Sequence, residues 1–309
     1  MTWRQNEIQN REVKRTMSEL SDTIRKLFKE GDDRRDAGLT TPEGILRYDD
    51  IVYGEDAGWQ VLDVYLLQKE EGPLPVIVSV HGGGWVYGDK ERYQYYCMDL
   101  ARRGFAVVNF TYRLAPEFKY PASLEDTNRV FAWVLDHAKE YGFDRSRIFG
   151  VGDSAGAHIL GLYAAICTNP DYAAAYPFQP PKGFVPAAVA LNCGVYRTPV
   201  SDDEKDQSNL LMADFLPEKG TREEFERISL VNFVTSQYPP VFLMTASGDF
   251  LRDQAPLLAE KLMEFEIPFV YRYFGNTDQP LGHVFHCNIR LKEASRCNDE
   301  ECEFFREYC

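Results

Sequence analysis

A strand, a sharp turn and a helix around Ser154 limit what this chain can fold into more than any other feature. Residues 148–151 are apolar and predict a buried strand, Gly152-Asp153-Ser154-Ala155-Gly156 predicts a tight turn, and residues 157–167 predict a helix. Glycine flanks the serine because a side chain at either position would obstruct so tight a turn. The turn is expected to expose Ser154 at the carboxyl end of the strand, near the positive end of the following helix. A serine in this place can act as a nucleophile if the chain also supplies a base, an acid and an oxyanion hole.

The rest of the chain alternates strands with helices, which is typical of an α/β domain built on a mostly parallel sheet. Two strands joined by a hairpin-like turn come first, at 46–53 and 60–67. Further strands are predicted at 75–80, 106–112, 148–151, 187–192, 241–246 and 269–273. Helices are predicted at 91–102, 122–140, 156–168, 253–265 and 288–306. We therefore expect residues 46–309 to form one α/β catalytic domain.

Two segments depart from this alternation and are interpreted as a cap. Residues 1–45 are predicted to form a helical segment, with a helix that ends at Gly31-Asp32-Asp33. Its apolar side chains recur at helical spacing: Ile8, Val13, Met17, Leu20, Ile24 and Leu27. This stripe must be buried, either as a lid over the site or in a homodimer contact. Residues 197–238 contain a connection longer than a compact α/β domain needs, which is typical of an insertion over a functional site, with a surface ornament as the alternative.

The charge balance and the cysteines restrict the partners and the cellular location. A net charge of −14 disfavours nucleic acid and anionic membrane surfaces as partners. No apolar run approaches the roughly 20 residues of a membrane span, and the N-terminal residues lack the apolar core of a signal peptide. The 7 cysteines are an odd number at scattered spacing, which predicts reduced thiols in a cytoplasmic protein. The last three are expected at the surface: Cys297, Cys302 and Cys309.

A glycine-rich loop, His81-Gly82-Gly83-Gly84-Trp85, follows the strand predicted at 75–80. Consecutive glycines allow backbone N–H groups to turn towards a carbonyl oxygen, where side chains would obstruct the substrate. The expected oxyanion donors are the N–H groups of Gly83, Gly84 and Ala155, with Gly82 in reserve. A phosphate cradle is the alternative, but the Lys-Ser/Thr pair that such a loop needs does not follow.

Three motifs in this order resemble the hormone-sensitive-lipase family of α/β-hydrolases, and the bacterial carboxylesterase and acetyl esterase branch fits best. They are His81-Gly-Gly-Gly-Trp85, Tyr112-Arg-Leu-Ala-Pro-Glu117 and Gly152-Asp-Ser-Ala-Gly156, and the resemblance covers residues 45–290. It implies an α/β-hydrolase fold with a mostly parallel eight-stranded sheet flanked by helices, a small helical cap, no cofactor, no metal and hydrolysis of short-acyl esters. In the second motif, Arg113 and Glu117 are expected to form a structural ion pair rather than to take part in catalysis.

The acid of the proposed triad is expected after the strand predicted at 241–246, because the chain order in this fold is serine, acid, histidine. Asp249 stands at that strand edge and matches the first aspartate of the family's Asp-x-Leu-x-Asp motif. Asp253 is expected to open the next helix, where a carboxylate suits the helix dipole.

The base must be one of five histidines, and His283 is preferred. His283-Val284-Phe285 resembles the family's His-Gly-Phe motif, with valine in place of glycine. His286 is the alternative. The other three are expected in the glycine loop, on a solvated helix face and in the core: His81, His137 and His158.

These residues predict a serine carboxylesterase acting on a small-molecule ester. Ser154 would attack the ester carbonyl, His283 would take its proton, and Asp249 would hold the imidazole, so that an acyl-enzyme forms and is hydrolysed by water. An amide hydrolase of the arylformamidase or acyl-peptidase type remains an alternative. A non-catalytic binding protein, as in the gibberellin receptors that resemble this family but lack the catalytic histidine, is a further alternative.

Overall fold

An eight-stranded sheet forms the centre of the computed structural model, which describes residues 19–68, 72–198 and 207–309. The strand order is β1-β2-β4-β3-β5-β6-β7-β8. The strands span β1 (Ile45–Val52), β2 (Val61–Leu67), β3 (Leu74–Val80), β4 (Ala106–Phe110), β5 (Phe143–Asp153), β6 (Val189–Asn192), β7 (Val241–Ala246) and β8 (Phe269–Phe274). The pairs β1–β2 and β2–β4 are antiparallel, and all other neighbours are parallel. The predicted mostly parallel sheet is thereby confirmed.

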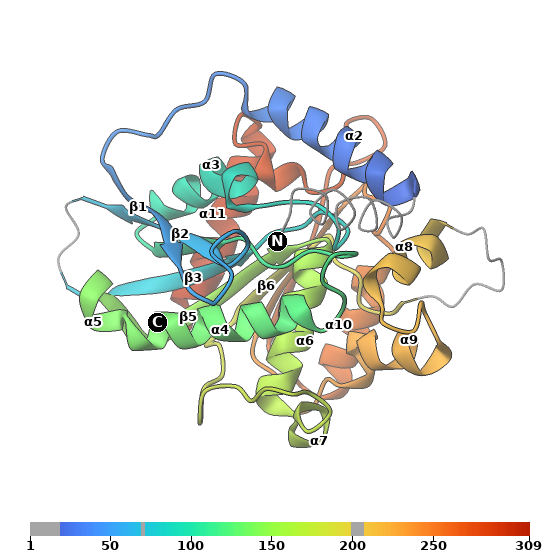
Figure 1. Cartoon of the computed structure of the whole chain (residues 1–309). Coiled ribbons are helices and arrows are strands. Elements are labelled where there is room, and N and C mark those ends of the chain that lie inside the picture. The colour runs from blue at the N-terminus through green and yellow to red at the C-terminus, as the bar shows by residue number, and fades with distance from the viewer. Residues whose placement is uncertain (1–18, 69–71, 199–206) are drawn as a thin grey trace, which may run out of the picture.

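Helices cover both faces of the sheet, as Figure 1 shows. They span α2 (Glu19–Asp36), α3 (Lys90–Ala101), α4 (Ala122–Asp136), α5 (Ala138–Tyr141), α6 (Ala155–Thr168), α7 (Pro170–Ala173), α8 (Gln207–Phe215), α9 (Arg222–Ile228), α10 (Gln254–Glu264) and α11 (Lys292–Arg306), with short 3-10 turns η1 (Leu230–Asn232) and η2 (Phe285–Cys287). One apolar core lies between the sheet and α4, α6 and α10, and a second lies between the sheet and α3 and α11. This double covering explains why the central strands are apolar on both faces.

The strand register places the carboxyl ends of β3, β5, β6 and β7 along one edge of the sheet. Val80 pairs with Gly152, Asp153 pairs with Asn192, and Asn192 pairs with Met244. In open parallel sheets, ligands bind at the carboxyl ends of the strands. The loops that follow these strands are therefore the place to examine the predicted site residues.

Two predicted helix boundaries are wrong. The N-terminal helix does not end at Gly31, because α2 continues to Asp36. Interior glycine costs about 1 kcal/mol in a helix, but here the next turn is held by contacts of Asp32 with Tyr87 and of Asp33 with Arg92. The helix predicted at 122–140 is divided into α4 and α5 at residue 137.

The cysteines are all free, as predicted, but two of the three near the C-terminus are not at the surface. Cys297 and Cys302 are fully buried on the inner face of α11, whereas Cys309 is exposed. An amphipathic helix with seven buried residues among its fifteen explains this difference, since a thiol behaves as a small apolar group.

The segments interpreted as a cap lie beside one another. Helix α2 contacts α8, and both are seen on the right of Figure 1, α2 in blue and α8 in gold. The Ser21 hydroxyl donates to the Asp214 carboxylate between these two helices. Ile8, Val13 and Met17 of the predicted stripe, and the acidic residues 201–206, lie outside the described residues. None of the described helices combines the length and the apolar character needed to cross a membrane.

Candidate active site

Ser154 lies at the turn between β5 and α6, in the geometry that the pentapeptide predicts. Its backbone has φ +53°, a left-handed value that is rare for serine, and its N–H donates to Asn192 O at 2.9 Å. A Cβ atom on Gly152 would lie 2.6 Å from Gly156 O, and one on Gly156 would lie 2.0 Å from Val80 O. Both glycines are therefore required, and the turn presents a half-buried serine at the sheet edge.

Asp249 and His283 form a hydrogen-bonded pair near this edge. The His283 Nδ1 and Asp249 Oδ1 atoms are 2.6 Å apart, and the Asp249 side chain is fully buried. The Asp249 carboxylate also accepts hydrogen bonds from the Thr245 hydroxyl at 2.7 Å and from the Leu251 N–H at 2.8 Å. Burial favours the neutral acid, but these donors and the imidazole lower the pKa of Asp249 below its ordinary value. An ionised acid can fix the tautomer of His283.

The backbone around His283 is tied to the Asp249 loop. Gly248 and Gly282 form a parallel bridge, with the Gly248 N–H donating to Leu281 O at 2.8 Å. Val284, the residue that replaces glycine in the family's motif, has φ +50°. This left-handed conformation explains why glycine is favoured there and costs a β-branched residue about 1 kcal/mol or more.

The other four histidines do not occupy the place of a base. His286 is buried against Cys287 and Tyr96, and burial lowers its pKa to about 3. His158 is also buried, as predicted, between the Trp85 indole N–H at 3.1 Å and Ile228 O at 2.7 Å. His81 stacks on Tyr112 in the core. His137 is half-buried on Trp133 rather than solvated, which corrects the prediction.

The glycine loop after β3 has the open backbone that the sequence predicts. Gly83 and Gly84 have φ +119° and φ +61°, and a Cβ atom on Gly83 would lie 2.1 Å from Tyr87 O. Among the described residues, the N–H groups of Gly83 and Gly84 have no acceptor within the chain. Gly82 is different, because its N–H already donates to the Tyr93 hydroxyl at 2.9 Å. This bond removes Gly82 as the reserve donor.

Residues that sequence reasoning missed hold this loop. Tyr93 of α3 accepts from Gly82 N–H and donates to Asp153 Oδ2 at 2.7 Å, which joins the loop to the serine turn. The Tyr112 hydroxyl donates to His81 O at 2.9 Å. Asp153 is buried, and burial raises its pKa to about 6 despite the Tyr93 bond. No local motif marks Tyr93, because it comes from the following helix.

Cys193 is a further neighbour that the sequence did not indicate. It follows β6, has φ +49°, and is buried with its thiol within 4.8 Å of ligand atoms of Asp249 and His283. A second group of this kind consists of Asp153, His286 and Cys287. Burial raises the pKa of both thiols, which disfavours the thiolate that a metal ion requires. We therefore assign neither group to a metal.

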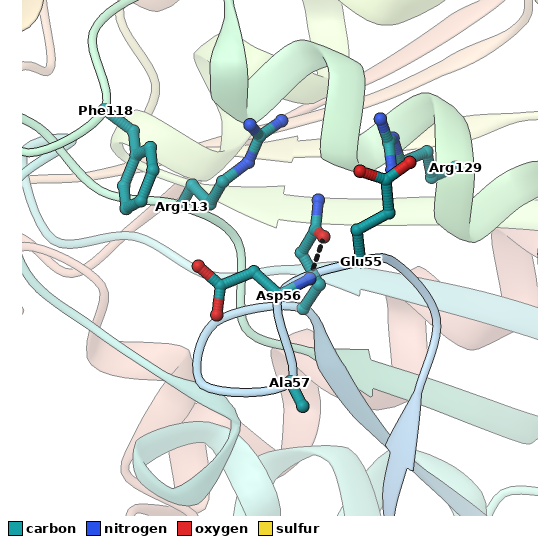
Figure 2. A pocket seen from close by; sticks show the side chains of 7 residues that line it. Glu55, Asp56, Ala57, Arg113, Phe118 and Arg129 are labelled. Carbon is teal, nitrogen blue, oxygen red and sulfur yellow. Dashed lines mark hydrogen bonds between the residues drawn. The ribbon is translucent and has the colours of Figure 1, made fainter. Parts of the chain in front are cut away.

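The ion pair predicted between Arg113 and Glu117 is wrong. Arg113 instead pairs with Glu125 and Asp126 of α4, both at 2.8 Å. It also lines a separate cavity of about 360 Å³ beside the turn between β1 and β2. Figure 2 shows this cavity, in which the Arg113 and Arg129 side chains lie near Asp56 and Glu55 of that turn. None of the described residues that line this cavity is a candidate catalytic residue.

The family comparison agrees with the motifs. The BD-FAE family model matches residues 62–262, which is more than half of the chain. Carboxylesterase NlhH of Mycobacterium tuberculosis is 30% identical over 244 residues, covering 72% of this chain and 73% of that protein. Versiconal hemiacetal acetate esterase of Dothistroma septosporum is 26% identical over 227 residues, covering 68% and 67% of the two chains. The structure of esterase B from Lactobacillus rhamnosis has a TM-score of 0.85 at 24% identity, and the match covers 94% of this chain and 97% of that chain.

The fold defines an α/β-hydrolase, and the relatives define a carboxylic-ester hydrolase. The chain belongs to the BD-FAE family and is an α/β-hydrolase of the hormone-sensitive-lipase type, which confirms the resemblance stated from its three motifs.

Proposed function

We propose that this esterase hydrolyses short-acyl esters through a triad of Ser154, His283 and Asp249. The observation that carries the proposal is the 2.6 Å contact of the His283 and Asp249 side chains at the sheet edge where Ser154 stands on its left-handed turn. The residues come from three loops, after β5, β7 and β8, in the chain order that this fold uses.

In the proposed reaction, His283 removes the Ser154 proton as the serine oxygen attacks the ester carbonyl. Asp249 holds the neutral imidazole in its tautomer and then stabilises the imidazolium. The N–H groups of Gly83, Gly84 and Ala155 receive the oxyanion, and each such donor contributes on the order of 3 kcal/mol to the transition state. His283 then returns the proton to the leaving alcohol. Water repeats the two steps on the acyl-enzyme.

Two contacts support a small acyl group and a cap over the site. Leu211 of α8 lies over the glycine loop, 3.7 Å from the position of a Cβ atom on Gly84. Phe215, at the end of α8, stacks on Trp85 with ring centroids 5.1 Å apart. Large side chains therefore stand beside the proposed oxyanion donors. We propose that residues 1–45 and 197–238 together form the cap, and a relative named for an acetate ester agrees with a short acyl group.

An ester panel tests the proposal. We expect p-nitrophenyl esters from acetate to decanoate to be hydrolysed, with kcat/KM greatest for acetate or butyrate. Ser154→Ala is expected to keep its fold and to lose activity on the order of a millionfold. A folded Ser154→Ala variant that retains activity would contradict the triad. If the wild type hydrolysed anilides but no ester, the amide hydrolase would be favoured, and binding without any turnover would favour the receptor-like alternative.

A further inference from the structure

Arg25, on helix α2, contacts the loop that carries the proposed oxyanion donors. Its Nε donates to Val86 O at 2.7 Å and its Nη2 donates to Ala115 O at 2.9 Å. Ala115 N–H in turn donates to Trp85 O at 3.0 Å. One guanidinium therefore bonds to Val86, which follows the glycine loop, and to Ala115, whose own loop is hydrogen-bonded to Trp85.

Glu117 fixes the orientation of this guanidinium. The two carboxylate oxygens accept from Nη1 and Nη2 of Arg25 at 2.9 and 2.7 Å, and both side chains are about three-quarters buried. Burial would raise the pKa of Glu117, but Arg25 lowers it below its ordinary value. A two-pronged pair of this kind sets direction as well as charge, which an ammonium group cannot reproduce. The glutamate that ends the motif at residues 112–117 thus acts on α2, not on Arg113.

Further contacts of α2 reach the same part of the loop. The Tyr87 hydroxyl donates to Asp32 Oδ2 at 2.8 Å, and the ring of Phe28 meets that of Tyr87 edge-on at 5.9 Å. Val86 and Tyr87 donate their N–H groups to Gly83 O at 3.3 and 3.0 Å. The residues that α2 contacts are therefore those that close the turn at Gly83.

We propose that Arg25 is a positioning residue for the oxyanion loop. By holding Val86 and Ala115 through their carbonyl oxygens, it keeps the Gly83 and Gly84 N–H groups aimed at the substrate oxygen. This assignment rests on the proposed esterase function. Because the donors act most strongly on the charge that develops in the transition state, loss of Arg25 must lower kcat more than it raises KM.

The test compares Arg25→Gln with Glu117→Gln and with Lys29→Gln as a matched control. Lys29 is on the same helix and pairs with Asp33 on its exposed side, so its loss leaves the contacts to Val86 and Ala115 in place. With p-nitrophenyl acetate, we expect kcat of Arg25→Gln to fall between about 10-fold and 100-fold, with KM within about 3-fold of wild type. Glu117→Gln is expected to lose less kcat than Arg25→Gln, because the glutamine amide oxygen still accepts one Arg25 N–H and the bonds of Arg25 to Val86 O and Ala115 O remain. Lys29→Gln is expected to behave as wild type.

Thermal melting separates positioning from stability. If Arg25 had a purely structural role, the loss of kcat would follow the loss of melting temperature in both Arg25→Gln and Glu117→Gln. That result would overturn the assignment. If Arg25→Gln does not fold, Arg25→Lys supplies the same test, because an ammonium cannot reach Val86 O, Ala115 O and Glu117 together; its kcat must fall several-fold. A wild type without esterase activity would contradict the proposed function itself. An active wild type with unchanged kcat in the folded Arg25 variants would overturn the Arg25 assignment alone.

Discussion

The two sides of the candidate site are built from different parts of the chain. On the acid–base side, the Asp249 and His283 side chains meet directly, and their supports, Thr245 and Leu251, are within a few residues of Asp249. On the oxyanion side, the proposed donors are backbone N–H groups of a loop with left-handed glycines. That loop is held by residues from other elements, among which Tyr93 belongs to α3.

This difference separates chemistry that depends on residue type from chemistry that depends on backbone shape. Replacing a side chain on the acid–base side removes a reacting group. Replacing a support on the oxyanion side leaves every reacting group present and changes only the direction of the donors, so its effect should be smaller and distributed over several residues.

Two buried aspartates illustrate the same contrast electrostatically. Asp249 has three donors, and its pKa is lowered despite its burial. Asp153, on the oxyanion side, is also buried, and its pKa is raised to about 6 because the Tyr93 hydroxyl does not offset the loss of solvent. The first is suited to carry charge during the reaction, and the second is suited to a fixed structural bond.

The largest effect is expected from His283→Ala. Removing the proposed base should lower kcat/KM for p-nitrophenyl acetate nearly as much as Ser154→Ala, on the order of a millionfold, because the members of a triad act as a unit. His286→Ala is the control: this ring is fully buried against Cys287 and Tyr96 and does not contact the Asp249 carboxylate as His283 does, so most of the rate of the folded variant should remain. Equal losses in the two variants would contradict the assignment of the base.

Gly83→Ala is the sharpest test of the oxyanion side. The new methyl group would lie 2.1 Å from Tyr87 O at a residue with φ +119°, so the loop must move. We expect kcat to fall about 100-fold to 1000-fold, as for the loss of one oxyanion donor. Gly104→Ala provides a control, because Gly104 also has positive φ but no atom within 4 Å of its Cβ position. Wild-type kcat in Gly83→Ala would contradict the role of the loop.

Tyr93→Phe tests the support of the loop without adding atoms. It leaves Gly82 N–H and Asp153 Oδ2 without their shared partner, so we expect unfolding free energy to fall by about 1–3 kcal/mol and kcat to fall about 10-fold. Tyr96→Phe on the same helix removes a hydroxyl that contacts Glu301 instead. Its stability should also fall, but its kcat should not. Parallel losses of kcat in both variants would argue against a specific bridge.

The pH dependence of stability distinguishes the two aspartates. Because the folded protein raises the pKa of Asp153 to about 6, it binds a proton that the unfolded chain releases from about pH 4 upward. Wild type should therefore lose stability relative to Asp153→Asn as the pH rises from about 4 through about 6, and the difference should level off above about pH 7. Calorimetric melting temperatures at pH 4–8 measure it. A difference independent of pH would show that the Asp153 pKa is not raised.

The smallest effect is expected at Val284, on the acid–base side. Val284→Gly removes the strain of φ +50°, whereas Val284→Ala keeps a Cβ atom in the same conformation. The glycine variant should be more stable than the alanine variant by about 1 kcal/mol, with similar kcat in both. Urea denaturation measures the difference, and a more stable alanine variant would contradict the left-handed backbone.

The sequence predicted well those features that depend on local residue types. Strands β7 and β8 and the turn around Ser154 follow from apolar runs and flanking glycines, and the pairing of Asp249 with His283 follows from motif order. The partners of Arg113 and Glu117 could not be predicted in this way. They belong to α4 and α2, and proximity along the chain suggested a pair that the fold does not form.

The same limit explains the errors in helix ends and in the supports of the oxyanion loop. Gly31 is a helix terminator by propensity, but contacts made by Asp32 and Asp33 to distant residues offset this preference. Tyr93 and Arg25 bond to backbone atoms, which leave no pattern in the sequence. Residues that act through the backbone of another element become visible only when the elements are placed in space.

The most direct test of Ser154 as the nucleophile is covalent labelling of the native protein with a fluorophosphonate, followed by intact-mass measurement and peptide mapping. The proposed triad predicts one adduct, on the peptide that contains Ser154, with rapid labelling of wild type and none of Ser154→Ala. It also predicts that labelling of His283→Ala is slowed by orders of magnitude, because the serine then lacks its base. No adduct on an active wild type, or an equal adduct on Ser154→Ala, would contradict Ser154 as the nucleophile.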